Sequence, residues 1–197
     1  MSQPNTSKGK LLIFSAPSGS GKTTLVKHLL EKIGNLTFSV SATSRMPRLG
    51  EVNGKDYYFL ATTDFQQKIK ENAFLEWEEV YPAVFYGTLL SQIEEKRAAG
   101  LNVIFDVDVV GGLNIKKYYG AEALAVFVQA PSIEILAQRL NQRGTDDIES
   151  IQKRLDKAAY EMTFAPKFDH IIVNDKLEDA QRELEATVKQ FLEIKHE

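Results

Sequence analysis

Residues 16–24 combine glycines with side chains that bind phosphate. Read in order, they are Ala16, Pro17, Ser18, Gly19, Ser20, Gly21, Lys22, Thr23 and Thr24. The glycines let successive backbone N–H groups point at a phosphate, and Lys22 can reach the β- and γ-phosphates of a nucleotide. The Thr23 hydroxyl is suited to bind Mg²⁺. We therefore predict a P-loop, although Ala16 stands where the general pattern has glycine.

Two arginines three residues apart, Arg45 and Arg48, flank Pro47. Planar guanidinium groups suit a phosphate monoester, and Tyr57 and Tyr86 could add hydroxyl donors to the same anion. Taken alone, the arginine pair is more typical of a solvated basic turn. In a chain with a P-loop, a second phosphate site is the stronger interpretation.

Three carboxylates have positions suited to ligand binding. Glu76 lies among apolar neighbours in the segment 74–77, either as an exposed strand residue or as a carboxylate that accepts N–H donors from a ligand. Asp106 and Asp108 follow an apolar run of strand length. Ligands of doubly wound sheets bind at the carboxyl ends of strands, so both acids should face the same cleft as Lys22. Asp106 would hold Mg²⁺ directly or through water, although such acids can instead cap a helix or turn.

Three further arginines lie in the second half of the chain. Arg139 and Arg143 are four residues apart on one helical face, and Arg154 lies on the next predicted helix. Their mutual repulsion is relieved when phosphate oxygens bind between them, so we interpret this segment as an anion-binding flap. The alternative is ordinary pairing with nearby acids, namely Asp146, Asp147 and Glu149.

Strands and helices alternate around these residues. Continuous apolar segments predict four buried parallel strands, at Leu11–Ser15, Leu101–Asp106, Leu124–Gln129 and His170–Val173. Helical periodicity predicts helices over Thr23–Ile33, Leu89–Ala99, Ile133–Gln142, Ile148–Thr163 and Leu177–Ile194. Ser132 and Asp175 are expected to cap two of these helices. The pattern predicts an α/β fold, a doubly wound parallel sheet with helices on both faces.

Two segments interrupt this alternation. Between residues 37 and 88, alternating apolar residues, aromatics and an Asn53-Gly54 turn predict antiparallel strands and a short helix beginning near Asp64. We expect this segment to be an inserted lobe of mixed α and β structure. Residues 138–158 are expected to form a small helical lid. The core of this single domain would comprise 11–36, 89–137 and 159–197, after a disordered lead-in over residues 1–10.

Composition argues against several other classes of protein. Among 197 residues, 24 Lys and Arg face 27 Asp and Glu, and the net charge of −3 argues against nucleic-acid binding. The chain has no cysteine, and its three histidines show no metal-ligand spacing. No apolar run approaches the length of a membrane span, and the first ten residues lack the apolar region of a signal peptide. We expect a cytoplasmic protein without nucleic-acid or membrane partners.

From residue 11 onward, the chain resembles the guanylate kinase family. The most specific segment, Ser39 to Phe59, is similar to the family's signature for the acceptor nucleotide. Later matching segments follow in order, at 74–77, 86–88, 106–108, 139–144 and 172–175. The segment 81–85 is about one residue longer than the common family pattern, so the pairing of Tyr86 and Thr88 depends on the Tyr-Gly-Thr match. Ala16 also occurs in this family.

The resemblance implies a P-loop nucleoside monophosphate kinase that uses Mg²⁺ and converts ATP and GMP to ADP and GDP. It implies a GMP site that holds the phosphate with Arg45, Arg48, Tyr57 and Tyr86 and the guanine with Ser41, Glu76, Thr88 and Asp108, close to Asp106. ATP would be held by residues 16–24, with Asn174 near its adenine. The transferring phosphate would be stabilised by Lys22, Arg48, Arg139, Arg143 and Arg154, and Mg²⁺ held by Thr23 and Asp106.

The residue types fit this implied chemistry. Guanine presents its N1–H and its exocyclic amine together, and the single carboxylate of Glu76 can accept from both, whereas adenine would leave it unpaired. Both inserted segments are expected to close before transfer, since water could otherwise take the γ-phosphate. The acceptor could include dGMP, and the protein could be a monomer or a homodimer. Two alternatives stay open: a related kinase for another small phosphate ester, and a non-catalytic module of this family that binds proteins.

Overall fold

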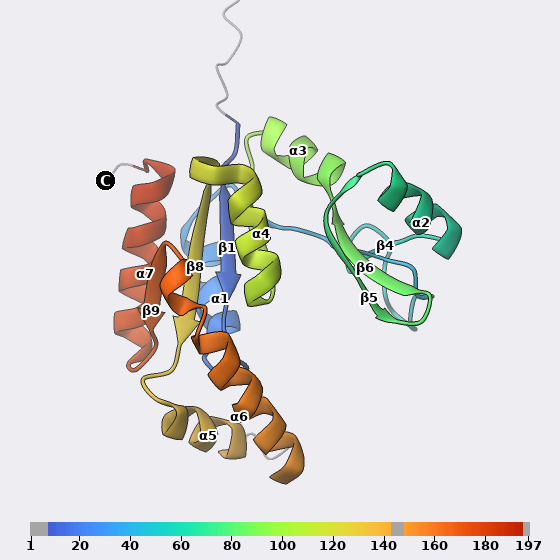
Figure 1. The fold of residues 1–197 in the computed structure, drawn as a ribbon. Helices are drawn as coiled ribbons and strands as arrows, with labels where there is room; N and C mark the ends of the chain where they lie inside the picture. The colour runs from blue at the N-terminus through green and yellow to red at the C-terminus, as the bar shows by residue number, and fades with distance from the viewer. Residues whose placement is uncertain (1–7, 143–147, 195–197) are drawn as a thin grey trace, which may run out of the picture. The chain divides into compact units, whose positions relative to one another are not determined.

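The computed structural model describes residues 8–142 and 148–194, which form two compact units. Unit 1 comprises residues 8–9 and 37–103, and unit 2 comprises residues 10–36, 104–142 and 148–194. Figure 1 shows the helices and strands of both units and labels most of them. Each unit has its own hydrophobic core cluster.

The predicted elements of the core are present in the structure. The strands are β1 (Leu11–Ser15), β2 (Leu36–Phe38), β3 (Ala42–Thr43), β4 (Tyr58–Phe59), β5 (Phe74–Tyr81), β6 (Val84–Leu89), β7 (Asn102–Asp106), β8 (Ala123–Gln129) and β9 (His170–Val173). The helices are α1 (Lys22–Lys32), α2 (Thr62–Lys70), α3 (Leu90–Ala98), α4 (Val109–Tyr119), α5 (Ile133–Gln142), α6 (Ile148–Met162) and α7 (Leu177–Leu192). The five predicted helices and four predicted buried strands are confirmed, with small differences at their ends.

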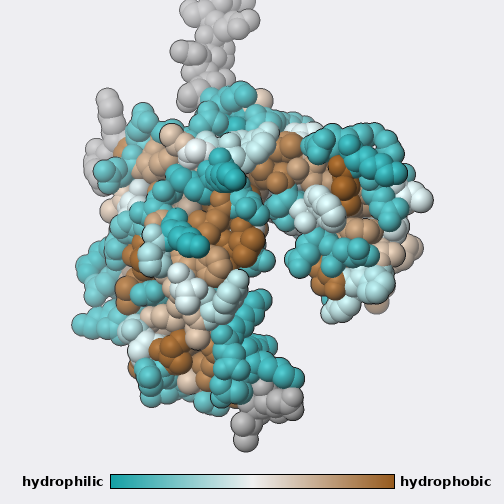
Figure 2. Space-filling model, in the orientation of Figure 1, coloured by the Kyte–Doolittle hydropathy of each residue, from teal (hydrophilic) through white to brown (hydrophobic). Residues whose placement is uncertain are grey.

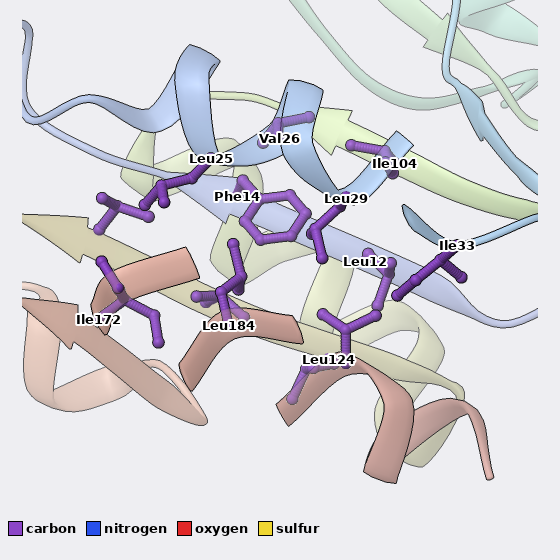
Figure 3. Packing of buried hydrophobic residues seen from close by; sticks show 14 residues of the cluster. Leu12, Phe14, Leu25, Val26, Leu29, Ile33, Ile104, Leu124, Ile172 and Leu184 are labelled. Atoms are coloured by element: carbon purple, nitrogen blue, oxygen red, sulfur yellow. The ribbon is translucent and has the colours of Figure 1, made fainter. Parts of the chain in front are cut away.

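The central sheet is parallel and has the strand order β2-β7-β1-β8-β9. β1 pairs in parallel with β8, and β8 pairs in parallel with β9. Side chains alternate between the two faces of a strand. On one face, Leu12 and Phe14 of β1 pack with Leu25 and Leu29 of α1 and with Leu184 of α7 (Figure 3). This face is therefore buried under α1 and α7.

The opposite face of the sheet is covered by α4. A β-carbon at Gly112 of α4 would lie 2.8 Å from Ser15 Oγ and 3.2 Å from Ile13 Cγ2, so only glycine lets the helix approach this closely. Because both faces are covered, the strands consist of continuous apolar residues rather than alternating ones. The predicted doubly wound α/β fold is confirmed.

Helix α4 was not predicted from the sequence. Gly111 and Gly112 weaken its helical propensity by about 1 kcal/mol each relative to alanine. The helix forms because the Asp108 side chain caps it, accepting the Gly111 N–H at 2.7 Å, and because Ile115 is fully buried.

Two predicted caps had different outcomes. The Ser132 hydroxyl accepts the Ile135 N–H at 3.3 Å, as expected of a cap. In contrast, α7 is preceded by Lys176 and has no side-chain cap from Asp175.

Unit 1 contains a four-stranded sheet in the order β4-β3-β6-β5. β6 is antiparallel to both β3 and β5, as predicted, but β3 and β4 are parallel because the chain between them makes a long excursion through residues 44–57. The alternating residues 39–41 lie between two strands, since β2 ends at Phe38 and β3 begins at Ala42. The core of this unit centres on Phe65 of α2, whose ring stacks on that of Phe74 at 4.2 Å.

Part of the expected disordered lead-in has defined contacts. The backbone N–H of Gly9 donates to the carbonyl of Arg97, and Arg97 Nε donates to the carbonyl of Gly9, both at 2.9 Å. Lys10 Nζ donates to the Phe191 carbonyl at 2.8 Å. The prediction of disorder up to residue 10 was therefore wrong for residues 8–10, because these contacts hold the backbone before β1.

The surface of the described residues is mostly hydrophilic on the face that Figure 2 shows, with apolar side chains in small separate areas. Within residues 8–142 and 148–194, no helix is both long and apolar enough to cross a membrane.

Candidate nucleotide sites

The predicted P-loop connects β1 to α1 at the carboxyl end of β1. Gly19 and Gly21 have φ angles of 92° and 91°, a backbone region that residues with a β-carbon rarely adopt. The loop lines a cavity of about 410 Å³, which falls in the range of small-ligand sites. The positive end of the α1 helix dipole lies at the end of this loop and would stabilise an anion there. The geometry therefore suits a polyphosphate.

A second cavity, of about 370 Å³, adjoins the other side of the loop. Its lining includes Gly19, Gly21, Arg139, Asn174 and Leu177. The Asn174 side chain, predicted to lie near adenine, donates from Nδ2 to the Ser20 carbonyl at 2.8 Å and is largely buried. Asn174 thus lines this cavity and also fixes the P-loop backbone.

Lys22 and Asp106 form an ion pair, with Nζ donating to Oδ1. Thr23 lines the same cavity as this pair. The prediction that the acids after β7 face the same cleft as Lys22 is consistent with this lining, which also includes Asp108. One oxygen of Asp108 is engaged by the N-terminus of α4, so the residue acts as a helix cap in the structure.

The donor set of this cavity is suited to Mg²⁺. Thr23 and Asp106 supply oxygen atoms, which this ion prefers. Within the described residues, no group of three or more His, Cys, Asp or Glu side chains could hold a metal ion by itself. At a nucleotide site, magnesium keeps several waters and binds one or two protein groups plus phosphate oxygens.

Two of the three predicted flap arginines lie in the described part of the chain. Arg139 Nη2 donates to the Asn174 carbonyl at 2.9 Å and lines the second cavity. Arg154 lines the first cavity, with its Nη1 3.4 Å from Ser18 Oγ. Arg143 lies outside the described residues. Both described arginines thus contact residues that border the P-loop cavities.

In unit 1, Arg45 is held in a fixed orientation. Its guanidinium donates two parallel hydrogen bonds of 2.6 Å to the Glu51 carboxylate, and its Nε donates to the Tyr86 hydroxyl at 3.1 Å. Its guanidinium carbon lies 4.9 Å from the centre of the Tyr57 ring. Arg45 holds the pKa of Glu51 at about 2, well below its usual value, with help from the Arg48 backbone N–H. The Glu51 hydrogen bonds raise the pKa of Arg45, which stays positively charged.

The predicted base-reading residues pair across β5 and β6. Glu76 lies opposite Thr88 in the strand register, and the Thr88 hydroxyl donates to Glu76 Oε1 at 2.6 Å. Tyr86 and Thr88 are two positions apart on β6 and therefore share a face of the sheet. In the longer segment 81–85, residues 82 and 83 form the hairpin turn between β5 and β6, and the strand pairing is irregular between Glu79 and Tyr81. Ser41 precedes β3 and accepts the Tyr58 N–H through its carbonyl.

The structure thus gathers the predicted residues into two groups. In unit 2, the P-loop, Asp106, Asp108 and Arg154 border one cavity. In unit 1, Arg45, Tyr57 and Tyr86 form one contact network, while the Arg48 side chain is exposed.

Sequence reasoning missed Glu51, whose spacing of six residues from Arg45 could have indicated a charge partner. It also missed Lys157 and Glu161, which line the P-loop cavity.

Comparisons with known proteins agree with one another. The family model described as guanylate kinase matches residues 8–191. A guanylate kinase from Bacteroides fragilis is 56% identical over 189 residues, covering 96% of this chain and 93% of its own length. One from Porphyromonas gingivalis is 50% identical over 93% of this chain and 98% of its own length. The crystal structure of guanylate kinase from Anaplasma phagocytophilum aligns with a TM-score of 0.66 and 26% identity, over 96% of this chain and 88% of that one.

Proposed function

This chain belongs to the guanylate kinase family, and we propose that it transfers the γ-phosphoryl group of ATP to GMP. An oxygen of the GMP phosphate attacks the γ-phosphorus, the bond from that phosphorus to its bridging oxygen breaks, and ADP leaves with GDP as the other product. The observation that carries the proposal is the P-loop, which keeps Gly21, Lys22 and Thr23 and in which Lys22 lines a cavity large enough for a triphosphate. A non-catalytic module would have no need to retain this lysine.

Unit 2 is the proposed ATP-binding unit. Residues 16–24 would bind the phosphates through backbone N–H groups and Lys22, and the cavity beside Asn174 would take the adenine. Thr23 and Asp106 would hold Mg²⁺, which supplies positive charge to the β- and γ-phosphate oxygens when bound. Arg139, Arg143 and Arg154 would add further charge, with residues 138–158 as the lid.

Unit 1 supplies the proposed GMP-binding lobe, residues 37–88. Arg45, Arg48, Tyr57 and Tyr86 would bind the phosphate, and Glu51 keeps Arg45 oriented for it. Ser41, Glu76 and Thr88 of this unit would read guanine. Glu76 is supported as the reader of N1–H and the exocyclic amine because the Thr88 hydroxyl fixes one carboxylate oxygen. A base that lacks these donors would form no hydrogen bonds with this carboxylate.

None of the proposed contacts with GMP involves its ribose. Because the proposed recognition involves the phosphate and the base, dGMP should serve as an acceptor alongside GMP. We further propose that the enzyme works in the cytoplasm.

Product analysis tests the proposal. ATP, GMP, Mg²⁺ and the protein are mixed and followed by ³¹P nuclear magnetic resonance. The proposal predicts that the GMP signal is replaced by the two signals of GDP while ATP becomes ADP in equal amount. Formation of ADP and inorganic phosphate without GDP would contradict it.

A further inference from the structure

One face of α6 contributes three charged residues to the cavity that the P-loop lines. Arg154, Lys157 and Glu161 are spaced three and four residues apart, a spacing that places them on the same side of a helix. All three line the cavity together with Lys22 and Asp106. Arg154 already has a proposed role, whereas Lys157 and Glu161 have none.

Glu161 is an unusual residue for a phosphate site because it is both acidic and buried. Its side chain is only 9% exposed, and burial raises the pKa of its carboxyl group, as does the negative charge of Asp108. Lys157 and Lys22 lower this pKa. A buried carboxylate is costly unless a cation compensates it, so its position beside a site for anions calls for an explanation.

The other two acids that line the cavity have other partners, and Lys157 pairs with Glu161. Asp106 pairs with Lys22, and Asp108 accepts the Gly111 N–H. Among the described residues, Glu161 has one ion-pair partner, Lys157, whose Nζ lies 3.8 Å from its Oε1. That distance is too long for a strong hydrogen bond, so the donors of the ammonium group stay available to another anion. The Lys157 side chain is 71% exposed and can reach into the cavity.

We infer that Lys157 is a further phosphate-binding residue and that Glu161 is a positioning residue that holds its ammonium group at the cavity wall. Glu161 sits on a rigid helix and attracts the flexible lysine to the side of the cavity formed by α6. A triphosphate then meets a third cation there, in addition to Lys22 and Arg154. This inference rests on the proposed ATP-binding role of unit 2.

Calorimetric titration with a non-hydrolysable ATP analogue and Mg²⁺ tests the inference. The variants are Lys157→Ala, Glu161→Gln, the two combined, and Lys153→Ala as a matched control on the same helix but outside the cavity lining. Loss of one charge-assisted hydrogen bond predicts about tenfold weaker binding for Lys157→Ala. Glu161→Gln should also bind more weakly, by about fivefold, and the combined variant should be no weaker than Lys157→Ala. Lys153→Ala should bind like the unaltered protein.

The sign of the Glu161→Gln effect separates positioning from simple electrostatics. Removing a negative charge near a triphosphate would by itself strengthen binding, whereas loss of the positioning role weakens it. Equal or tighter binding by Glu161→Gln, or losses that multiply in the combined variant, would overturn the inference. Unchanged binding by Lys157→Ala would overturn it too, and because Lys157 is exposed, that variant is expected to fold.

Kinetics and stability complete the test. In the assay with GMP, Lys157→Ala should raise the KM for ATP while kcat and the KM for GMP stay within about twofold. Melting temperatures identify any variant whose loss of binding reflects unfolding. The Glu161→Asp variant keeps the negative charge and should therefore bind the ATP analogue more tightly than Glu161→Gln. Because the calorimetric readout needs no turnover, failure of the proposed kinase activity and failure of this inference can be told apart.

Discussion

The side-chain amide of Asn174 lies directly against Gly21 of the P-loop. A β-carbon at Gly21 would come within 2.2 Å of Asn174 Nδ2, and this same nitrogen donates to the Ser20 carbonyl at 2.8 Å. Arg139 in turn donates to the Asn174 carbonyl. The residue after β9 therefore connects the backbone of the phosphate loop to an arginine from α5.

Gly21→Ala should damage both stability and nucleotide binding. The added β-carbon would displace the Asn174 amide, and alanine disfavours a φ of 91°. We expect a loss of about 2–4 kcal/mol in the free energy of unfolding, measured by urea denaturation. Gly34→Ala is the matched control, because a β-carbon at Gly34 meets nothing within 4 Å. Equal stability of the two variants would contradict this account of the loop.

Lys22→Ala should lose most of its turnover while remaining folded. The side chain supplies charge to the transferring phosphate, and loss of one such contact costs about 100-fold or more in kcat. Lys27→Ala, which removes an exposed lysine from the same helix, is the control. A kcat of Lys22→Ala within tenfold of the unaltered enzyme would rule out the assigned role.

Glu76→Gln should impair the reaction of GMP selectively. The substitution replaces an acceptor with a donor that faces the guanine N–H groups, which should cost about 2–4 kcal/mol in kcat/KM. Thr88→Val should act in the same direction, because it removes the hydroxyl that donates to Glu76 at 2.6 Å and that is itself proposed to contact guanine. Glu71→Gln serves as a surface control. If rates with GMP and AMP fall by the same factor in Glu76→Gln, the carboxylate does not read the base.

The Arg45–Glu51 pair predicts a pH dependence of stability. The pKa of Glu51 is about 2 in the folded protein against an ordinary value of 4.5. The folded state therefore favours the ionised form, so this contribution to stability is complete above pH 4.5 and is lost as the pH falls toward 2. We expect the difference in free energy of unfolding between the unaltered protein and Glu51→Gln to be constant above about pH 5 and to shrink below it. A difference that does not change with pH between 7 and 3 would contradict this assignment.

Much of the fold could be predicted because local patterns and the final packing agree. Leu12 and Phe14 belong to a continuous apolar run, and such runs predict strands that are buried on both faces. Helix α4 could not be predicted from propensity, because Gly112 is unfavourable in an isolated helix and is required only by its contact with Ser15 and Ile13. The need for glycine at this position arises from packing between distant segments of the chain.

The candidate site shows the same division. The residues of the P-loop are adjacent in sequence, so their chemistry follows from local spacing. Glu161 could not be identified in this way, because an acid on an amphipathic helix is ordinarily solvated. Its burial beside Lys157 becomes evident only when α6 is placed against the cavity. The parallel pairing of β3 with β4 likewise depends on a chain excursion that strand patterns do not specify.

The choice of acceptor tests the central claim most directly. ADP formation from ATP and Mg²⁺ is measured in a coupled assay with GMP, dGMP, AMP, CMP and UMP, each at the same concentrations. We predict rapid ADP formation with GMP and dGMP, and kcat/KM values for AMP lower by about 10⁴-fold because adenine cannot donate the two hydrogen bonds that guanine offers to the Glu76 carboxylate. A comparable kcat/KM for GMP and AMP, or no ADP formation with GMP, would contradict the account.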